Sequence, residues 1–362
     1  MTTLFDPIQL GSIPCKNRIF MAPLTRARAT KEAVPTPIMA EYYAQRADAG
    51  LIISEAVGIS RQGLGWIYAP GIWNDEQVEA WKPITKAVHD KGGRIVCQLW
   101  HMGRMVASSV TGEQPVAPSV STAPGYIHTY EGKQPYEEAR ALRLDEIPGL
   151  IADYANAARN AIKAGFDGVQ LHAANGYLID EFLRDGTNQR TDQYGGSPEN
   201  RFRLLREVTE ALIGAIGAEK VGVRLSPNGE IQGCIDSDPA TVFVPAAKML
   251  QDLGTAWLEL RESDAEGSFP MAPRTNQPKL APEIRKVFTN PLVLNQGYTF
   301  EEAEKTVESG LANAIAFGRL FIGNPDLVER FRKHLPLVES DSHTWYGAWN
   351  GAKGYTDYPD AQ

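Results

Sequence analysis

A histidine, an asparagine and a tyrosine lie close together in the segment LHAANGYL, as His172, Asn175 and Tyr177. The side chains of His172 and Asn175, on a turn, could both donate hydrogen bonds to one carbonyl oxygen. Tyr177 follows on the same turn and could deliver a proton to a neighbouring atom. A single histidine or tyrosine more often caps a strand or packs in a loop, so this chemistry needs support from the rest of the chain.

Polar residues and glycines also follow short apolar runs elsewhere in the sequence. They include Thr25, Gln98, Arg224, Gly297, Gly318 and Arg319. Polar side chains that converge in a mostly apolar cavity indicate a ligand site, because their burial without partners would be costly. Gly297 and the pair Gly318-Arg319 would let a phosphate approach the backbone and would supply a cation for its charge.

Eight short apolar runs, many of them rich in β-branched residues, must position these groups. They span residues 18–22, 51–56, 94–101, 168–173, 221–226, 256–261, 291–296 and 314–319. Stretches with helical periodicity alternate with them, at residues 36–47, 75–90, 145–163, 197–216, 238–253, 299–309 and 324–333. The alternation predicts a parallel sheet of the α/β class, and the count of eight favours a closed (β/α)8 TIM barrel. An open doubly wound sheet is the alternative, although the sequence has no G-x-G-x-x-G motif.

In such a barrel, the polar residues named above fall at the C-terminal ends of the strands, where active sites are built. The widest gap between two runs, residues 102–144, is rich in Pro, Gly and Ser. It predicts a capping insertion after strand 3, on the same face of the barrel. A second irregular stretch, residues 262–277, follows the sixth run on that face. We expect residues 1–362 to form a single domain.

Composition and charge exclude several classes of protein. Hydrophobic residues make up 43% of the chain, which is enough to bury a substantial core. The net charge of -8 and the scattered lysines and arginines offer no basic stripe, so nucleic acid is not an expected partner. Cys15, Cys97 and Cys234 lie far apart and predict neither a disulfide framework nor a metal site. No apolar run reaches the length of a signal peptide or a membrane span, so we expect a cytoplasmic protein with no membrane partner.

Long motifs carry a resemblance to one known family. The segment HAANGYLIDEFL, followed by Asn188, Arg190, YGG at 194–196 and ENR at 199–201, resembles the signature of the Old Yellow Enzyme family. APLTRARA, QLWHMGR, VRLSPNG and AIAFGRLFIGNPDL support the match, which runs almost end to end. The resemblance implies a TIM barrel with non-covalently bound FMN that uses NAD(P)H to reduce activated C=C bonds.

The resemblance also implies which residues contact the flavin. Thr25 would hydrogen-bond near the flavin C4 carbonyl, with Pro23, Leu24 and the backbone of Ala56 beside the ring. Gln98 and Arg224 would contact the pyrimidine edge, where Arg224 would stabilise negative charge at N1 and O2. The phosphate would be bound by Gly297, Gly318 and Arg319.

For the substrate, the resemblance implies that His172 and Asn175 clamp an oxygen atom while Tyr177 protonates the α-carbon. The reaction would be ping-pong, with FMN carrying hydride from NAD(P)H to an α,β-unsaturated aldehyde, ketone, imide or nitroalkene. Four aromatic residues are candidate walls of the substrate pocket, with core packing as an equal alternative for each. They are Trp66, Tyr68, Trp100 and Tyr355. The loop at 262–277 matches no pattern of the family, and we expect a monomer or a homodimer.

Other functions fit the barrel less well. A Schiff-base lyase needs a lysine at a strand end, and none of the eight predicted ends has one. A glycosidase needs two carboxylates there, and Glu55 with Glu259 or Glu262 is the only available pairing. A flavin-binding sensor or electron carrier would need neither the clamp nor Tyr177.

Overall fold

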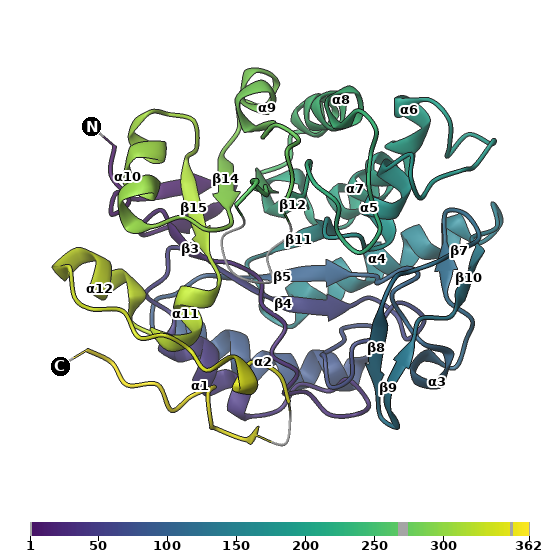
Figure 1. The fold of residues 1–362 in the computed structure, drawn as a ribbon. Coiled ribbons are helices and arrows are strands. Elements are labelled where there is room, and N and C mark those ends of the chain that lie inside the picture. The colour runs from purple at the N-terminus through teal and green to yellow at the C-terminus, as the bar shows by residue number, and fades with distance from the viewer. Residues whose placement is uncertain (1, 267–273, 348–349, 362) are drawn as a thin grey trace.

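The computed structural model describes residues 2–266, 274–347 and 350–361, and its centre is a closed barrel of eight parallel strands (Figure 1). The strands follow one another around the barrel in the order β11-β12-β13-β14-β15-β3-β4-β5. Their bounds are β3 (Ile19–Met21), β4 (Ile52–Gly58), β5 (Ile95–Trp100), β11 (Gly168–Ala173), β12 (Val221–Leu225), β13 (Trp257–Arg261), β14 (Leu292–Asn295) and β15 (Ala314–Phe317). Each predicted apolar run overlaps one of these strands, and β4 extends two residues beyond its run, so the predicted TIM barrel is confirmed.

The strands are buried on both faces, which is why they read as continuous apolar runs. Apolar side chains such as Phe20, Val96, Trp257 and Val293 pack into one cluster of the core. Gly222 makes room for Trp257 in this packing, since a Cβ at Gly222 would lie 2.0 Å from Trp257 Cε2. A larger cluster combines barrel residues with residues of the surrounding helices.

Helices surround the barrel (Figure 1). They are α1 (Ile38–Gln45), α2 (Asp75–Asp90), α4 (Ile147–Lys163), α5 (Leu178–Leu183), α6 (Pro198–Arg201), α7 (Arg203–Ile216), α8 (Pro239–Asp252), α9 (Ala281–Val287), α10 (Phe300–Glu308), α11 (Arg319–Gly323) and α12 (Leu327–Lys333), with 3-10 turns η1 (Ala218–Lys220) and η2 (Ser342–Thr344). All seven predicted helical stretches contain helices, although residues 197–216 divide into α6 and α7. Helix α9 is not predicted by periodicity. Its first turn depends on a distant residue, since the Glu262 carboxylate accepts hydrogen bonds from the backbone N–H groups of Leu280 and Ala281.

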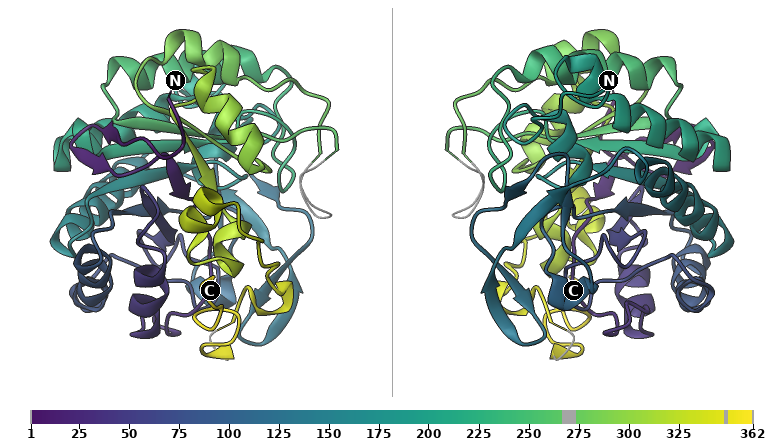
Figure 2. Two further views of the ribbon diagram at one scale, coloured as in Figure 1. Left: turned by 90° about the vertical axis from the view of Figure 1, so that its left-hand side faces the viewer. Right: turned by 90° about the vertical axis from the view of Figure 1, so that its right-hand side faces the viewer.

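A short hairpin closes the N-terminal end of the barrel and was also not predicted. Its strands are β1 (Ile8–Leu10) and β2 (Ile13–Cys15). A Cβ on Gly168, the first residue of β11, would lie 3.1 Å from Ile13 Cδ1, so the hairpin packs where the barrel strands begin. In Figure 2 the hairpin lies on the opposite side of the barrel from strands β8 and β9. The hairpin therefore takes no part in the mouth formed by the C-terminal ends of the strands.

The capping insertion predicted after strand 3 is confirmed, and it has more regular structure than its composition indicated. It contains α3 (Ser108–Thr111), β6 (Val116–Ala117), β7 (Ser121–Thr122), β8 (Tyr126–Thr129), β9 (Gly132–Pro135) and β10 (Glu138–Ala141). Strand β10 lies between β6 and β7, while β8 and β9 form a separate hairpin. The hairpin packs on the rest of the insertion through Ala107, Val110 and Ile127.

Two buried arginines attach the segment that follows α12 to the segment that follows β3. Arg26 Nε and Arg28 Nη1 each donate a hydrogen bond of 2.9 Å to the carbonyl oxygen of Trp345. Tyr355 stacks on Tyr42 with ring centroids 4.1 Å apart, and both guanidinium groups lie over its ring. Among the described residues, the guanidinium groups of Arg26 and Arg28 form no salt bridge and instead donate mainly to backbone carbonyls. Within the described residues, no helix combines the length and the apolar character needed to cross a membrane.

Candidate active site

His172 lies near the C-terminal end of β11, and its side chain is buried. Its Nδ1 accepts a hydrogen bond of 3.3 Å from the backbone N–H of Ala174, which leaves Nε2 to carry the proton. Burial lowers the pKa of His172 well below its usual value, and the charges of Arg224 and Arg261 lower it further. The imidazole is therefore neutral and presents one N–H donor.

Asn175 and Gly176 form the tight turn that follows His172. Their φ angles are 60° and 77°, and the left-handed region is costly for Asn175 unless neighbouring groups hold it there. Ser226 provides that support, since Asn175 N donates to Ser226 Oγ at 2.8 Å. Gly176 N donates to Asp180 Oδ2 at the same distance. The Oδ1 atom of Asn175 is buried without a hydrogen-bond partner among the described residues. Because Oδ1 only accepts, the amide would bind a substrate oxygen through its Nδ2 donor.

Tyr177 packs edge-on against the other two rings of this site. Its ring centroid lies 5.1 Å from that of His172 and 4.9 Å from that of Trp100. Burial raises the pKa of Tyr177 far above its usual value, so the phenol keeps its proton. The three residues identified from the sequence are thus brought together, with a neutral imidazole, an amide and a phenol on one turn.

A chain of buried side-chain hydrogen bonds crosses the barrel beneath this turn. Gln98 Nε2 donates to Gln170 Oε1 at 2.9 Å, and Gln170 Nε2 donates to Glu259 Oε2 at 2.8 Å. Arg224 Nε donates to Glu259 Oε1 at 2.8 Å, and Arg224 Nη2 donates to Asn295 Oδ1 at 2.7 Å. Gln98 and Arg224, both expected at the flavin, are therefore held at the two sides of a single network whose central acceptor is Glu259.

The residues expected beside the flavin ring and its phosphate also lie near one another. Ala56 is paired with Gln98 in the register of β4 and β5. Pro23, Leu24 and Thr25 are half-buried in the segment after β3. A Cβ on Gly318 would lie 3.3 Å from Leu24 Cδ2, so the ends of β3 and β15 are in contact.

Gln296 and Gly297 follow β14 with φ angles of 95° and 78°. Two consecutive left-handed residues turn the backbone sharply, and the second of them has no side chain to obstruct a ligand. Arg319 is half-buried at the start of α11, beside Gly318. The loops after β14 and β15 thus combine backbone that a ligand can approach closely with one cation, as a phosphate site requires.

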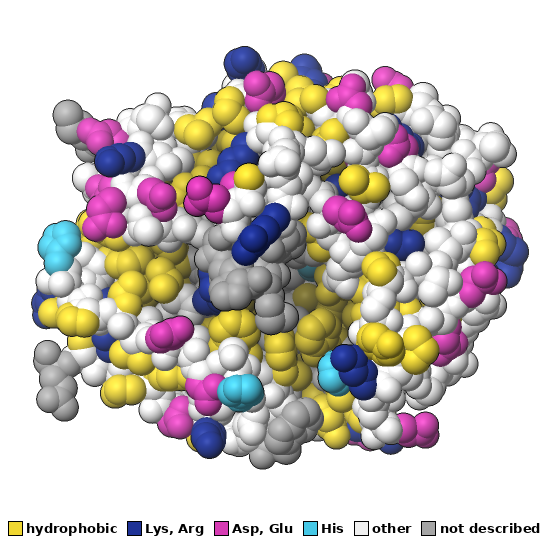
Figure 3. All heavy atoms as spheres, in the orientation of Figure 1, with side chains coloured by type: hydrophobic (Ala, Val, Ile, Leu, Met, Phe, Trp, Pro, Cys, Tyr) yellow, Lys and Arg dark blue, Asp and Glu magenta, His cyan; other side chains and the backbone are white. Residues whose placement is uncertain are grey.

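Aromatic side chains form one wall around the clamp. The ring centroid of Trp66 lies 6.5 Å from that of Trp100 and 5.2 Å from that of Tyr346. Tyr68 packs edge-on against Tyr130 of the insertion at 5.4 Å. Core packing fits Tyr355 better than a role in the pocket, because its ring is fully buried in the stack with Tyr42. Hydrophobic side chains gather near the centre of the face shown in Figure 3.

Two residues of the site, Gln170 and Tyr346, could not be assigned from the sequence. The sequence identified Arg261 only as a polar residue at a strand end, and Glu259 only as a candidate carboxylate for a glycosidase. Glu259 and Arg261 are two positions apart on β13, so their side chains lie on the same face of the strand. This spacing was the only signal in the sequence that both face the barrel interior. Phe269 and Pro270, in the irregular loop at 262–277, lie outside the described residues.

The carboxylates considered for a glycosidase are all engaged in other contacts. Glu55 accepts hydrogen bonds from Arg26 N and from the Tyr43 hydroxyl, and Glu262 caps α9. Glu259 pairs with Arg224. In the parts of the chain that the structure describes, no cluster of three or more His, Cys, Asp or Glu residues could hold a metal ion.

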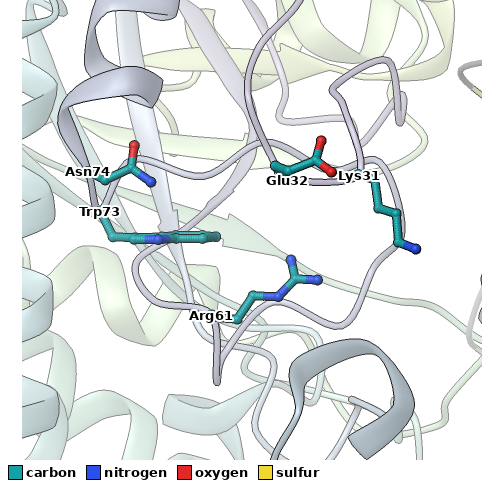
Figure 4. Close-up of a pocket in the computed structure, with 5 residues that line it drawn as sticks. All are labelled: Lys31, Glu32, Arg61, Trp73 and Asn74. Atoms are coloured by element: carbon teal, nitrogen blue, oxygen red, sulfur yellow. The ribbon is translucent and has the colours of Figure 1, made fainter.

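A separate hollow of about 360 Å³ opens on the surface (Figure 4). It is lined by Lys31, Glu32, Arg61, Trp73 and Asn74. Arg61 donates to the carbonyl oxygen of Val110, and Asn74 caps α2. These two side chains have structural contacts, and none of the clamp residues lines the hollow, so we assign it no part in the chemistry.

Comparisons with known proteins agree with this geometry. The sequence matches the NADH:flavin oxidoreductase / NADH oxidase family over residues 3–338. The fold is similar to that of the Old Yellow Enzyme homologue from Zymomonas mobilis, with a TM-score of 0.97 and 66% identity over 99% of this chain and 100% of that one. It is also similar to morphinone reductase in complex with tetrahydroNAD, with a TM-score of 0.92 and 44% identity over 100% and 98% of the two chains. A putative 12-oxophytodienoate reductase of Oryza sativa subsp. japonica is 43% identical over 98% of this chain and 92% of its own length.

Proposed function

The chain belongs to the NADH:flavin oxidoreductase / NADH oxidase family, and on that premise we propose how its residues carry out FMN-dependent reduction of activated C=C bonds with NAD(P)H. The observation that supports the proposal best is the turn that brings His172, Asn175 and Tyr177 together above the Gln98–Arg224 network. We propose α,β-unsaturated aldehydes, ketones, imides and nitroalkenes as substrates. The relatives named for morphinone and for 12-oxophytodienoate support this class.

The residues at the barrel mouth fit FMN. Gln98 and Arg224 are fixed by the network and can present hydrogen-bonding atoms to a pyrimidine ring. Pro23, Leu24, Thr25 and Ala56 supply a mostly apolar border. Gly297, Gly318 and Arg319 suit a phosphate. We propose that these residues bind FMN without a covalent bond.

When bound, FMN would supply the hydride, after receiving it from NAD(P)H in a separate half-reaction. His172 Nε2 and the Asn175 amide hold the substrate oxygen, where negative charge grows as the C=C bond is reduced. Because the imidazole is neutral and buried, its donor is directed at this charge without first losing a hydration shell. The Tyr177 hydroxyl gives its proton to the α-carbon. Trp66, Tyr68 and Trp100 border the substrate and exclude water.

We also propose that the whole chain acts as one domain, because the segment after α12 is attached to the barrel by Arg26 and Arg28. A cytoplasmic location is consistent with Cys15, Cys97 and Cys234, which are free and buried. A monomer or a homodimer remains our expectation for the assembly.

The proposed function is tested with purified protein. It should show the absorption of bound flavin, and a colourless protein that gains no such band on adding FMN would exclude the assignment. In stopped-flow experiments, replacing His172 and Asn175 together by alanine should slow alkene reduction by roughly 100-fold or more. Flavin reduction by NAD(P)H should change less, so equal rates of alkene reduction in variant and wild type would refute the clamp.

A further inference from the structure

Arg261 ends β13 at the mouth of the barrel. Side chains alternate along a strand, so Arg261 faces the same way as Glu259, whose carboxylate accepts hydrogen bonds inside the barrel. Arg261 pairs in register with Asn295 of β14, the residue that accepts the hydrogen bond from Arg224 Nη2. The guanidinium of Arg261 is therefore one layer closer to the mouth than Glu259 and beside the Arg224 network.

Among the described residues, no carboxylate forms a salt bridge with the guanidinium of Arg261, and Asp180 acts on it only at longer range. The Nη1 atom of Arg261 is buried and makes no hydrogen bond. Burial, together with the nearby charge of Arg224, lowers the pKa of Arg261 to about 9. A partly buried cation beside a second cation is costly unless an anion or a strong acceptor binds it.

Among the described charged groups near the mouth of the barrel, Arg261 is the one without a paired counter-charge. Arg224 has its counter-charge in Glu259, and Asp180 is paired with Arg184 at 2.8 Å. His172 is neutral because burial lowers its pKa. Of these groups, Arg261 alone contributes a net positive charge to the space where the clamp and the network meet.

The order of the strands places Arg261 beneath any ligand that spans the proposed FMN site. Strand β13 lies between β12, which carries Arg224, and β14, which leads into Gly297. A molecule held by Arg224 at one end and by the loop of Gly297 at the other must cross the end of β13. Arg261 is the residue at that end.

We propose that Arg261 contacts FMN and stabilises the negative charge of its reduced form, so that it raises the reduction potential of the bound flavin. The inference rests on the proposed function, since it requires FMN at the mouth. The chemistry balances: hydride from NAD(P)H brings two electrons and one proton to neutral FMN and leaves one negative charge on the flavin. Arg261 adds a second positive charge beside Arg224, whose own charge is paired with Glu259.

The test is the two-electron midpoint potential of the holoenzyme, measured spectrophotometrically against a reference dye. Arg261→Met removes the charge and keeps the length of the side chain, Arg261→Lys keeps the charge, and Arg143→Met is a matched control at an exposed arginine. Loss of the charge should weaken binding of reduced FMN relative to oxidised FMN by roughly 10-fold to 100-fold, which lowers the potential by about 30 to 60 mV. The potential of Arg261→Lys should lie closer to that of the wild type than to that of Arg261→Met. Arg143→Met should leave the potential unchanged.

An unchanged potential in Arg261→Met with FMN bound overturns the inference. If the KM for the alkene is raised in the same variant, the result assigns Arg261 to the substrate instead of the flavin. If Arg261→Met does not retain FMN, the same measurement is made on Arg261→Gln in saturating FMN, with the same criterion. Wild-type protein that binds no FMN would instead refute the proposed function. Failure of the Arg261 inference and failure of the proposed function can therefore be told apart.

Discussion

Glu259→Gln should weaken FMN binding although Glu259 lies below the proposed flavin site. The carboxylate accepts from two donors, Gln170 Nε2 and Arg224 Nε. A glutamine has only one acceptor oxygen, and its amide nitrogen must donate. Because the arginine can only donate, the oxygen of the introduced amide must face Arg224 and its nitrogen must face Gln170.

That reversal passes along the network. Gln170 must turn its oxygen towards position 259, so its nitrogen then faces Gln98, which in the wild type donates to Gln170 Oε1. Gln98 must turn as well, and it then presents a donor where it had presented an acceptor. The hydrogen bonds are re-formed but the buried counter-charge of Arg224 is lost, which costs about 3 to 5 kcal/mol of unfolding free energy. One mismatched hydrogen bond to FMN costs about 1 to 2 kcal/mol, so the Kd for FMN should rise roughly 5-fold to 30-fold.

The assay is FMN titration of apoprotein, followed by flavin fluorescence, together with urea unfolding. The control is Glu301→Gln at an exposed position. Glu259→Gln combined with Gln170→Glu moves the carboxylate one step along the network and restores the orientation of Gln98, so FMN affinity should recover. Wild-type affinity in the single variant, or no recovery in the double variant, would refute the network argument.

Three further variants test other parts of the site. Tyr177→Phe should reduce turnover of enones by about 100-fold to 10,000-fold while nitroalkenes still reoxidise the flavin, because their nitronate products can be protonated by water; equal losses for both substrates would give Tyr177 a positioning role. Arg319→Ala should weaken FMN retention by about 1.5 to 3 kcal/mol, measured by dialysis, and unchanged retention would place the phosphate elsewhere. Burial raises the pKa of Glu181 from 4.5 to about 8, so the folded protein keeps a proton that the unfolded chain loses. Wild-type stability should therefore fall as the pH rises through this window, by at most about 1.4 kcal/mol per pH unit. In urea unfolding, Glu181→Gln should reduce that slope, and an identical slope in the variant would contradict the assignment.

The barrel could be predicted from the sequence because its strands are buried on both faces and its helices have clear periodicity. The hairpin of β1 and β2 could not, because each strand has only three residues and gives no pattern. Helix α9 escaped prediction because the carboxylate that caps it, Glu262, comes from a separate part of the chain.

In the candidate site, the turn at His172, Asn175 and Tyr177 was predictable because the residues are neighbours in the sequence. The role of Glu259 was not, because it depends on the register that pairs β12 with β13 and places Arg224 opposite it. Tyr346 joins the aromatic wall only because the segment after α12 folds back over the barrel. Contacts of this kind are set by tertiary structure and leave no local pattern.

The contacts of Arg26 and Arg28 have a consequence for how the protein is made. Their guanidinium groups donate to the carbonyl oxygens of Thr344, Trp345 and Gly354, and β3 pairs with β15 to complete the barrel. A ribosome delivers the arginines long before it delivers these acceptors. The growing chain therefore holds an open sheet, and the guanidinium donors of Arg26 and Arg28 lack these acceptors, until residues 344–354 emerge. We expect the nascent polypeptide to depend on chaperones during that interval.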